Sequence, residues 1–216
     1  WEDALPEYMH LAYLPAPNIV RLRLSAYDVD KAEATKAIEC EFNKLSAVIG
    51  DNIVGYEGES IEHLIHQRLS ERGLTLAVAE SCTGGAIASK FTAMAGASQY
   101  FLAGVVSYSN ESKRDILGVR MADIEQYGAV SEEVARQMAE GVRRITGSDY
   151  ALATTGIAGP GGGSEAKPIG TVWMALATPT ATYAQMRNSG NDRGQVISRA
   201  TAYALDMLYD ELKKRD

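Results

Sequence analysis

One apolar run that turns abruptly into a helix of small residues limits the folds open to this chain. Residues 74–79 are apolar or small, which is typical of a buried strand. Residues 80–85 (ESCTGG) follow, and residues 86–91 have the composition of a helix. A strand that turns directly into a helix places the turn at the carboxyl end of a sheet. It also directs free backbone N–H groups and the positive end of the helix dipole at that turn.

Ser81 in this turn has two interpretations. As a nucleophile it would attack a carbonyl carbon while backbone amides hold the developing oxyanion. In a binding turn, Ser81 and Thr83 would only cap the helix, and an anion would dock on the amides. Cys82 is a rival nucleophile because a helix N-terminus lowers the pKa of a thiol, but a cysteine at a turn is also often just small and buried. The turn by itself leaves these readings open.

Charge and composition narrow the possible partners. A net charge of −7 and a pI near 5.1 disfavour nucleic acid, because phosphate contacts need a basic surface. No apolar run approaches the ~20 residues that cross a bilayer, so we expect a cytoplasmic protein with no membrane partner. Cys40 and Cys82 form neither a disulfide framework nor a metal cluster. His63 and His66 lack a third ligand, so a solvated helix face is favoured over a zinc site.

The order of strands and helices predicts the fold class. After residue 58, strands and helices alternate, and two adjacent strands come late in the chain. This order predicts an α/β fold, a three-layer sandwich with a mixed sheet. The expected strands are residues 74–79, 100–108, 150–154, 171–178 and 182–186. The expected helices are residues 60–72, 83–94, 110–117, 121–127, 132–146 and 192–214.

The first quarter of the chain is expected to be separate from this sandwich. Residues 1–18 contain three prolines and are interpreted as a connector from something upstream, and a chain that starts at Trp1 suggests a piece of a longer protein. Residues 19–57 predict a small α+β module of β-α-β order, with strands at 19–24 and 53–56 around a helix at 28–49. Residues 58–216 form the larger domain.

A serine nucleophile needs a base. The larger domain has no histidine beyond the two on its first helix, so a serine–histidine–aspartate triad is not expected. Lys113 falls near the start of a helix that Asn110 would cap, where the helix dipole disfavours a cation and lowers its pKa. The position of Lys113 fits a solvent-exposed side chain equally well. Lys90, in the helix after Ser81, is expected to be exposed to solvent. Tyr108, which ends the preceding strand, would orient Lys113, relay a proton or simply pack.

A glycine-rich loop at residues 154–164 is the second candidate for a binding element. Its glycines let backbone amides approach a ligand closely. The loop lacks the Gly-Lys-Ser/Thr of a nucleotide P-loop and the spacing of a dinucleotide-binding motif. A flexible linker is the alternative, but the strands on both sides favour an ordered loop. Arg193, at the start of the last helix, would offer a guanidinium to a phosphate or carboxylate, or lie exposed beside a capping Asp192.

Residues 74–214 resemble the C-terminal domain of the competence/damage-inducible CinA family, whose stand-alone (PncC-like) form is a nicotinamide mononucleotide amidase. Five motifs in the same order carry the resemblance. They are residues 79–85 (AESCTGG), 108–113 (YSNESK), 128–131 (GAVS), 156–163 (GIAGPGGG) and 168–172 (PIGTV). Residues 19–72 resemble the KH-type module that precedes this domain in full-length members. The upstream domain of those members is absent from this sequence.

The resemblance implies hydrolysis of the carboxamide of nicotinamide mononucleotide to nicotinic acid mononucleotide and ammonia, without a metal or a cofactor. It implies that Ser81 is the nucleophile and Lys113 the general base, with Tyr108 assisting. Together with the small first domain, the resemblance suggests a homodimer or larger homo-oligomer, and the acidic balance leaves no nucleic-acid partner expected. The substrate would be bound by Cys82, Thr83, Gly84, Thr155, Gly156, Gly159, Gly162 and Arg193.

Two alternatives remain beside this interpretation. In the first, the turn, the loop and Arg193 bind a nucleotide without turnover and regulate an upstream domain. In the second, the KH-like segment binds nucleic acid. KH modules clamp the backbone with a GXXG loop, and residues 19–56 contain none. Residues 55–58 (GYEG) match its letters only, because they are acidic and follow a predicted strand.

Overall fold

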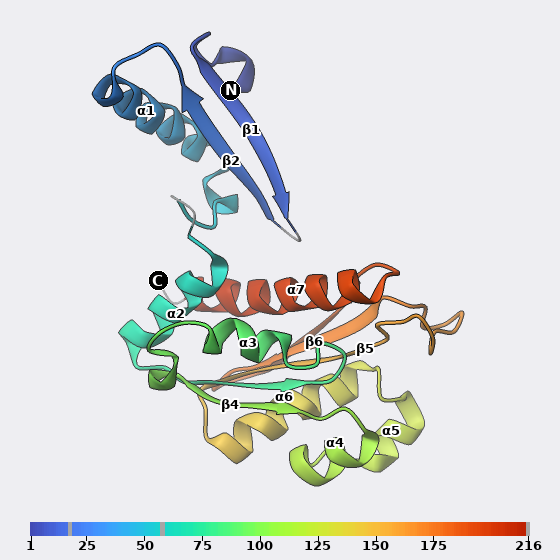
Figure 1. Ribbon diagram of the computed structural model, residues 1–216. Helices are drawn as coiled ribbons and strands as arrows, with labels where there is room; N and C mark the ends of the chain where they lie inside the picture. Colours follow the sequence, from blue (N-terminus) through green and yellow to red (C-terminus); the bar gives the residue numbers. More distant parts are fainter. Residues whose placement is uncertain (17–18, 57–58, 215–216) are drawn as a thin grey trace. The chain divides into compact units, whose positions relative to one another are not determined.

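The computed structural model describes residues 1–16, 19–56 and 59–214 (Figure 1). The chain divides into two compact units, Trp1–Glu59 and Ser60–Asp216. The domain boundary expected between residues 57 and 58 lies outside the described residues. Each unit contains its own sheet.

The first unit is a hairpin followed by a helix. Its elements are η1 (Glu2–Ala4), β1 (Met9–Ala16), β2 (Ile19–Ala26), α1 (Lys31–Ile49) and η2 (Gly50–Asn52). β1 pairs antiparallel with β2 along its whole length, from Met9↔Ala26 to Ala16↔Ile19. The helix begins after Asp30, whose carboxylate accepts hydrogen bonds from two amides of the first turn.

Two predictions for this unit are wrong. Residues 9–16 are a strand and not part of a connector; Pro15 is tolerated there because an edge strand can lack one N–H donor. Residues 53–56 are not a strand, so the observed order is β-β-α and not β-α-β. β1 supplies the partner that β2 needs, and Tyr56 instead closes a turn with Glu59. The predicted connector residues 17 and 18 lie outside the described chain.

The second unit has a five-stranded mixed sheet. In spatial order the strands are β4 (Phe101–Val106), β3 (Leu76–Glu80), β5 (Tyr150–Gly156), β6 (Thr171–Ala177) and β7 (Thr182–Asn188). β3 runs parallel to both of its neighbours, whereas β5, β6 and β7 alternate in direction. β3 is therefore the central parallel strand, and every one of its residues is buried.

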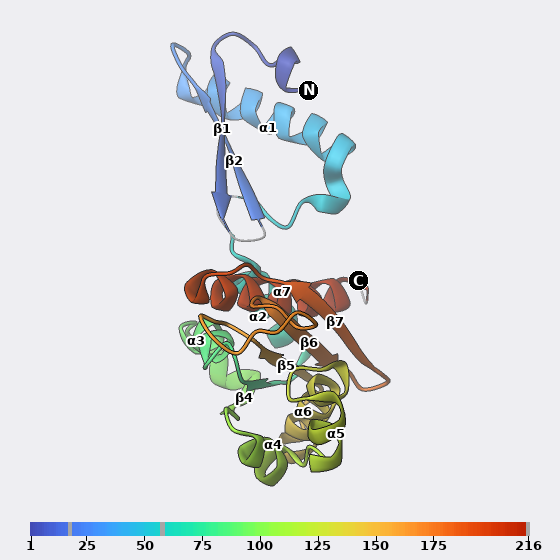
Figure 2. The same cartoon turned by 90° about the vertical axis from the view of Figure 1, so that its right-hand side faces the viewer.

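Helices cover both faces of this sheet, which confirms the predicted three-layer α/β sandwich (Figures 1 and 2). One layer contains α4 (Asn110–Leu117), α5 (Met121–Tyr127) and α6 (Glu132–Thr146). The other contains α2 (Ile61–Arg72), α3 (Ala86–Thr92) and α7 (Arg193–Lys213), and η3 (Ala97–Gln99) precedes β4. Alanines of β3, β5 and β6 pack against the apolar face of α6, so the sheet and the helix approach closely.

One glycine sets the position of α6 against α4. A Cβ at Gly141 would lie 2.1 Å from the Leu117 carbonyl oxygen, which is backbone and cannot rotate away. The two helices therefore touch through main chain at this point. Because α4 carries Lys113, this contact helps to fix the lysine relative to the sheet.

Candidate active site

Ser81 lies directly after β3, at the carboxyl end of the middle parallel strand. Its N–H donates to the Thr154 carbonyl oxygen at 3.0 Å, and its own carbonyl oxygen accepts the Gly84 N–H at 3.1 Å. The residue is 8% exposed. Backbone bonds therefore hold the serine on both sides, at the edge of the buried core.

Glu80, and not Ser81 or Thr83, caps helix α3. Its Oε2 atom accepts the N–H groups of Gly85 (3.0 Å) and Ile87 (3.1 Å), and its Oε1 atom accepts that of Ala88 (2.8 Å). The carboxylate is fully buried. An anion cannot dock on these three amides, because the side chain of Glu80 already occupies them.

Thr83 packs inward instead of capping. Its hydroxyl lies 2.7 Å from the hydroxyl of Thr154, and both residues are buried. Thr154 thus contacts the turn twice, through its carbonyl oxygen and through its side chain. Sequence reasoning missed this residue and selected Thr155. Alternation along β5 was the available signal, because neighbouring residues of a strand face opposite sides of the sheet.

Two amides of the turn remain for an oxyanion. Cys82, Thr83 and Gly84 are the residues of the turn expected to bind the substrate, but the Gly84 N–H is bonded to the Ser81 carbonyl oxygen. In the described part of the chain, the N–H groups of Cys82 and Thr83 have no acceptor. An oxyanion formed at Ser81 would therefore find two donors and not three.

Lys113 reaches Ser81 from α4. Its Nζ atom lies 3.1 Å from Ser81 Oγ, 2.8 Å from the Ser107 carbonyl oxygen and 3.3 Å from that of Tyr108. The residue is 1% exposed, and none of these partners is a carboxylate. Burial lowers the pKa of Lys113 because the charged form loses its hydration.

The cause of this lowered pKa differs from the one expected from sequence. Ser109, not Asn110, is the N-cap of α4, and it forms a reciprocal capping box with Ser112. Lys113 therefore sits one position further into the helix than predicted. Desolvation, rather than the helix dipole, lowers its pKa.

Cys82 is placed as a packing residue. It is buried, and burial raises the pKa of its thiol to about 12. A Cβ at Gly156 would lie 3.0 Å from Cys82 Sγ and 2.7 Å from Val172 Cγ2. The thiol is therefore neutral near pH 7. Gly156 leaves the space that Cys82 and Val172 need for close packing.

Tyr108 and Arg193 meet at the exposed side of the site. Tyr108 is 61% exposed, and its hydroxyl accepts a hydrogen bond from Arg193 Nη2 at 3.0 Å. Arg193 Nη1 donates to the Gly159 carbonyl oxygen at 2.8 Å. The side chain of Tyr108 therefore contacts the arginine; only its carbonyl oxygen contacts Lys113. Gly159 (φ 81°) and Gly162 (φ 85°) both have left-handed backbone conformations, and Gly162 is exposed at the rim.

Thr155 contacts the connection between α5 and α6. Its Oγ1 atom donates to the Ala129 carbonyl oxygen at 2.8 Å, and the residue is buried. The proton of this hydroxyl is thus used inside the protein. Thr155 therefore contributes to the site by holding the connection between α5 and α6.

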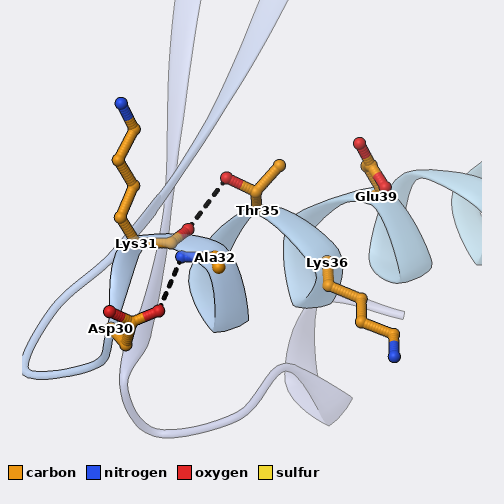
Figure 3. Close-up of a pocket in the computed structure, with 6 residues that line it drawn as sticks. All are labelled: Asp30, Lys31, Ala32, Thr35, Lys36 and Glu39. Atoms are coloured by element: carbon orange, nitrogen blue, oxygen red, sulfur yellow. Dashed lines mark hydrogen bonds between the residues drawn. The ribbon is translucent and has the colours of Figure 1, made fainter.

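The remaining candidate sites are weaker. No group of three metal-ligating side chains occurs among the described residues, and no helix there is long and apolar enough to cross a membrane. A hollow over the first turns of α1 has a volume of about 550 Å³. Figure 3 shows that Lys31 and Lys36 point away from each other there, so its polar groups do not converge on one ligand.

The fold and the site together define an α/β sandwich with a serine–lysine pair at the carboxyl end of β3, the middle one of its three parallel strands. Residues 58–212 match the family model described as the CinA C-terminal domain, and the chain belongs to this family. The resemblance noted from the motifs is thereby confirmed.

Relatives agree with this assignment. A CinA-like protein of Flavobacterium psychrophilum is 44% identical over 99% of this chain and 51% of its own length. A CinA-like protein of Shewanella sediminis is 45% identical over 96% of this chain and 49% of its own. The chain therefore spans about half the length of these curated relatives.

Solved structures match the second unit. The competence/damage inducible protein CihA from Agrobacterium tumefaciens superposes with a TM-score of 0.68 at 37% identity, over 74% of this chain and 99% of that one. The competence damage-inducible protein A (ComA) from Klebsiella pneumoniae gives a TM-score of 0.68 at 35% identity, over 72% and 98%.

Proposed function

We propose that this chain hydrolyses the carboxamide of nicotinamide mononucleotide to nicotinic acid mononucleotide and ammonia, with Ser81 as nucleophile and Lys113 as general base. The observation that carries the proposal is the 3.1 Å separation of Lys113 Nζ and Ser81 Oγ in a buried setting without a carboxylate. A carboxylate partner would hold the lysine charged and unable to accept a proton.

The contacts of Lys113 suit a neutral amine. A neutral amine has two N–H bonds and one lone pair. The carbonyl oxygens of Ser107 and Tyr108 accept the two N–H bonds. The lone pair then faces Ser81 Oγ, the third partner, and can accept the proton of its hydroxyl.

The reaction follows from this arrangement. Ser81 Oγ bonds to the carboxamide carbon as its proton moves to Lys113 Nζ. The Cys82 and Thr83 amides hold the oxyanion, an effect worth ~3 kcal/mol per donor. The C–N bond then breaks, and Lys113 gives its proton to the departing nitrogen, which leaves as ammonia. Water, with Lys113 again as base, attacks the resulting ester and releases the acid and Ser81.

Arg193 suits the phosphate of the substrate. A guanidinium has five N–H donors. The hydrogen bonds from Arg193 to Gly159 and Tyr108 use two of these donors, so three donors remain. A phosphate could bind these donors without breaking either contact, which would place the nucleotide tail beside the glycine-rich loop.

An ammonia-release assay with nicotinamide mononucleotide tests the proposal. We expect Ser81→Ala and Lys113→Met each to lower kcat/KM by about 10³-fold or more, with Cys82→Ala as the matched control that keeps most of the activity. Nicotinamide, which lacks the phosphate, should be a poor substrate. Full activity in Ser81→Ala would overturn the assignment. Tight binding measured by calorimetry, with no ammonia released by the unaltered chain, would instead select the regulatory nucleotide-binding module.

A further inference from the structure

Side chains bond every carbonyl oxygen of residues 127–130, at the end of α5 and in its connection to α6. The donors come from Ser131 and from two residues distant in sequence, Thr155 and Lys167. Lys167 Nζ donates to Tyr127 (2.5 Å) and Val130 (2.8 Å), Ser131 Oγ to Gly128 (2.8 Å), and Thr155 Oγ1 to Ala129 (2.8 Å). The connection itself, residues 128–131, is one of the five sequence motifs, and the amidase chemistry gives it no role.

Thr155 links this connection to the surroundings of Ser81. Glu80 pairs with Thr154 in parallel register, so Ser81 and Thr155 are neighbours just beyond the pair. Alternation along the strands turns both toward the face that α6 covers. Thr155 in turn holds the connection, while Lys113 approaches Ser81 from the β4 side. Ser81 therefore has Lys113 on the β4 side and Thr155, which holds Ala129, on the β5 side.

Lys167 joins this connection to the glycine-rich loop. It lies between the loop and β6 and is bonded to Ser164, the last residue of the loop. Ser164 N–H donates to the Lys167 carbonyl oxygen at 2.9 Å, and Lys167 N–H donates to Ser164 Oγ at 3.1 Å. Its ammonium lies at the carboxyl end of α5, where the helix dipole favours a cation. A Cβ at Gly128 would come within 3.2 Å of Nζ, so a glycine gives the lysine room.

We propose that Lys167 is a positioning residue that fixes the glycine-rich loop to residues 127–130 and thereby sets the wall of the site opposite Lys113. The loop is then held at two points, by Arg193 through Gly159 and by Lys167 through Tyr127 and Val130. The expected effect of Lys167 on catalysis rests on the proposed function. The expected attachment of the loop to residues 127–130 does not depend on that function.

Hydrogen–deuterium exchange tests the attachment without substrate. Lys167→Met keeps the length of the side chain but removes the ammonium group that donates both hydrogen bonds. Lys167→Arg keeps a cationic donor. Lys90→Met is the matched control, since Lys90 is an exposed lysine paired with Glu62 on another part of the unit. We expect exchange in residues 157–170 and 127–131 to be about 10-fold faster in Lys167→Met, partly restored in Lys167→Arg and unchanged in Lys90→Met. Unchanged exchange in Lys167→Met would overturn the proposal.

Kinetics with nicotinamide mononucleotide test the positioning. We expect kcat/KM to fall about 10-fold or more in Lys167→Met and to recover partly in Lys167→Arg. The pH profile of kcat should keep its midpoint, because Lys113 is untouched. Faster exchange with unaltered kcat/KM would refute a positioning role. If the unaltered chain releases no ammonia, the proposed function fails; the affinity of the same variants for the nucleotide then decides this inference, and equal affinities would overturn it.

Discussion

The hydroxyl of Tyr108 accepts a hydrogen bond from Arg193, a residue 85 positions later in the chain. The carbonyl oxygen of the same tyrosine accepts one from Lys113 Nζ at 3.3 Å. Tyr108 therefore contacts the candidate base through its main chain and the loop-binding arginine through its side chain. The two roles can be separated, because a substitution of the side chain leaves the carbonyl oxygen in place.

Tyr108→Phe removes the acceptor of Arg193 and nothing else. We expect KM for nicotinamide mononucleotide to rise about 2- to 10-fold, as for one partly exposed hydrogen bond, with little change in kcat. A double-mutant cycle with Arg193→Ala should be non-additive, because both changes remove the same contact. A fall of kcat by about 100-fold or more would instead give the hydroxyl a part in proton transfer.

Lys113 predicts a pH dependence for both activity and stability. Between its lowered folded-state pKa and the ordinary value of 10.5, the unfolded chain holds a proton on this amine that the folded chain does not. Unfolding then takes up protons, so the free energy of unfolding rises with pH across this window. Activity should rise in the same direction as the neutral amine forms. Urea unfolding over a pH series checks the first effect, and Lys113→Met should reduce its slope; a slope that persists would contradict the interpretation.

Glu80→Gln should destabilise the second unit. The carboxylate accepts three amide hydrogen bonds, whereas an amide side chain in its place has one oxygen and turns an NH₂ group toward N–H donors. We expect a loss of about 2–3 kcal/mol in the free energy of unfolding. Denaturant titration measures it. Glu111→Gln, on the exposed first turn of α4, is the control expected to change little.

The two cysteines should differ in reactivity. Cys40 is exposed, whereas Cys82 is buried with a pKa of about 12. A thiol reagent at pH 8 should therefore modify Cys40 alone in the native chain and both cysteines after denaturation. Rapid native labelling of Cys82 would show an exposed or ionised thiol and would reopen its reading as nucleophile.

Gly141→Ala should separate α6 from α4. The added methyl group would meet the Leu117 carbonyl group, so one of the two helices must shift. We expect a loss of about 3 kcal/mol in the free energy of unfolding and a fall in activity, since Lys113 is on α4. Gly161→Ala is the control: a Cβ there meets nothing within 4 Å. Equal stability of the two variants would show that α4 and α6 adjust without cost.

Local signals in the sequence predicted much of the second unit. The bounds of α5 and α6 were predicted to the residue, because Ser131 and the acidic first turn of α6 mark a helix start and glycines follow both helices. The strands differ from prediction by one or two residues at most of their ends. Their order in the sheet is a long-range property that local patterns do not contain.

The errors arose where a partner lies far away in the sequence. Prolines suggested a connector, but a neighbouring strand holds residues 9–16 in a hairpin. Glu80 belonged to a recognised motif, yet its capping role depends on how the chain turns back over the carboxylate. Lys113 was selected as the candidate base, but its pKa is lowered by burial. The elements that bury it cannot be identified from its position in the sequence.

The burial of β3 on both faces affects the order in which parts of the second unit unfold or are cut by a protease. A central strand bonded to neighbours on each side exchanges its amides only when the whole unit opens. Ser81 follows this strand directly, so the proposed nucleophile lies beside the element that we expect to open last on heating. The glycine-rich loop is exposed over much of its length. A protease should therefore cut the loop while the strand beside Ser81 is still folded, and inactivation by nicking should precede melting.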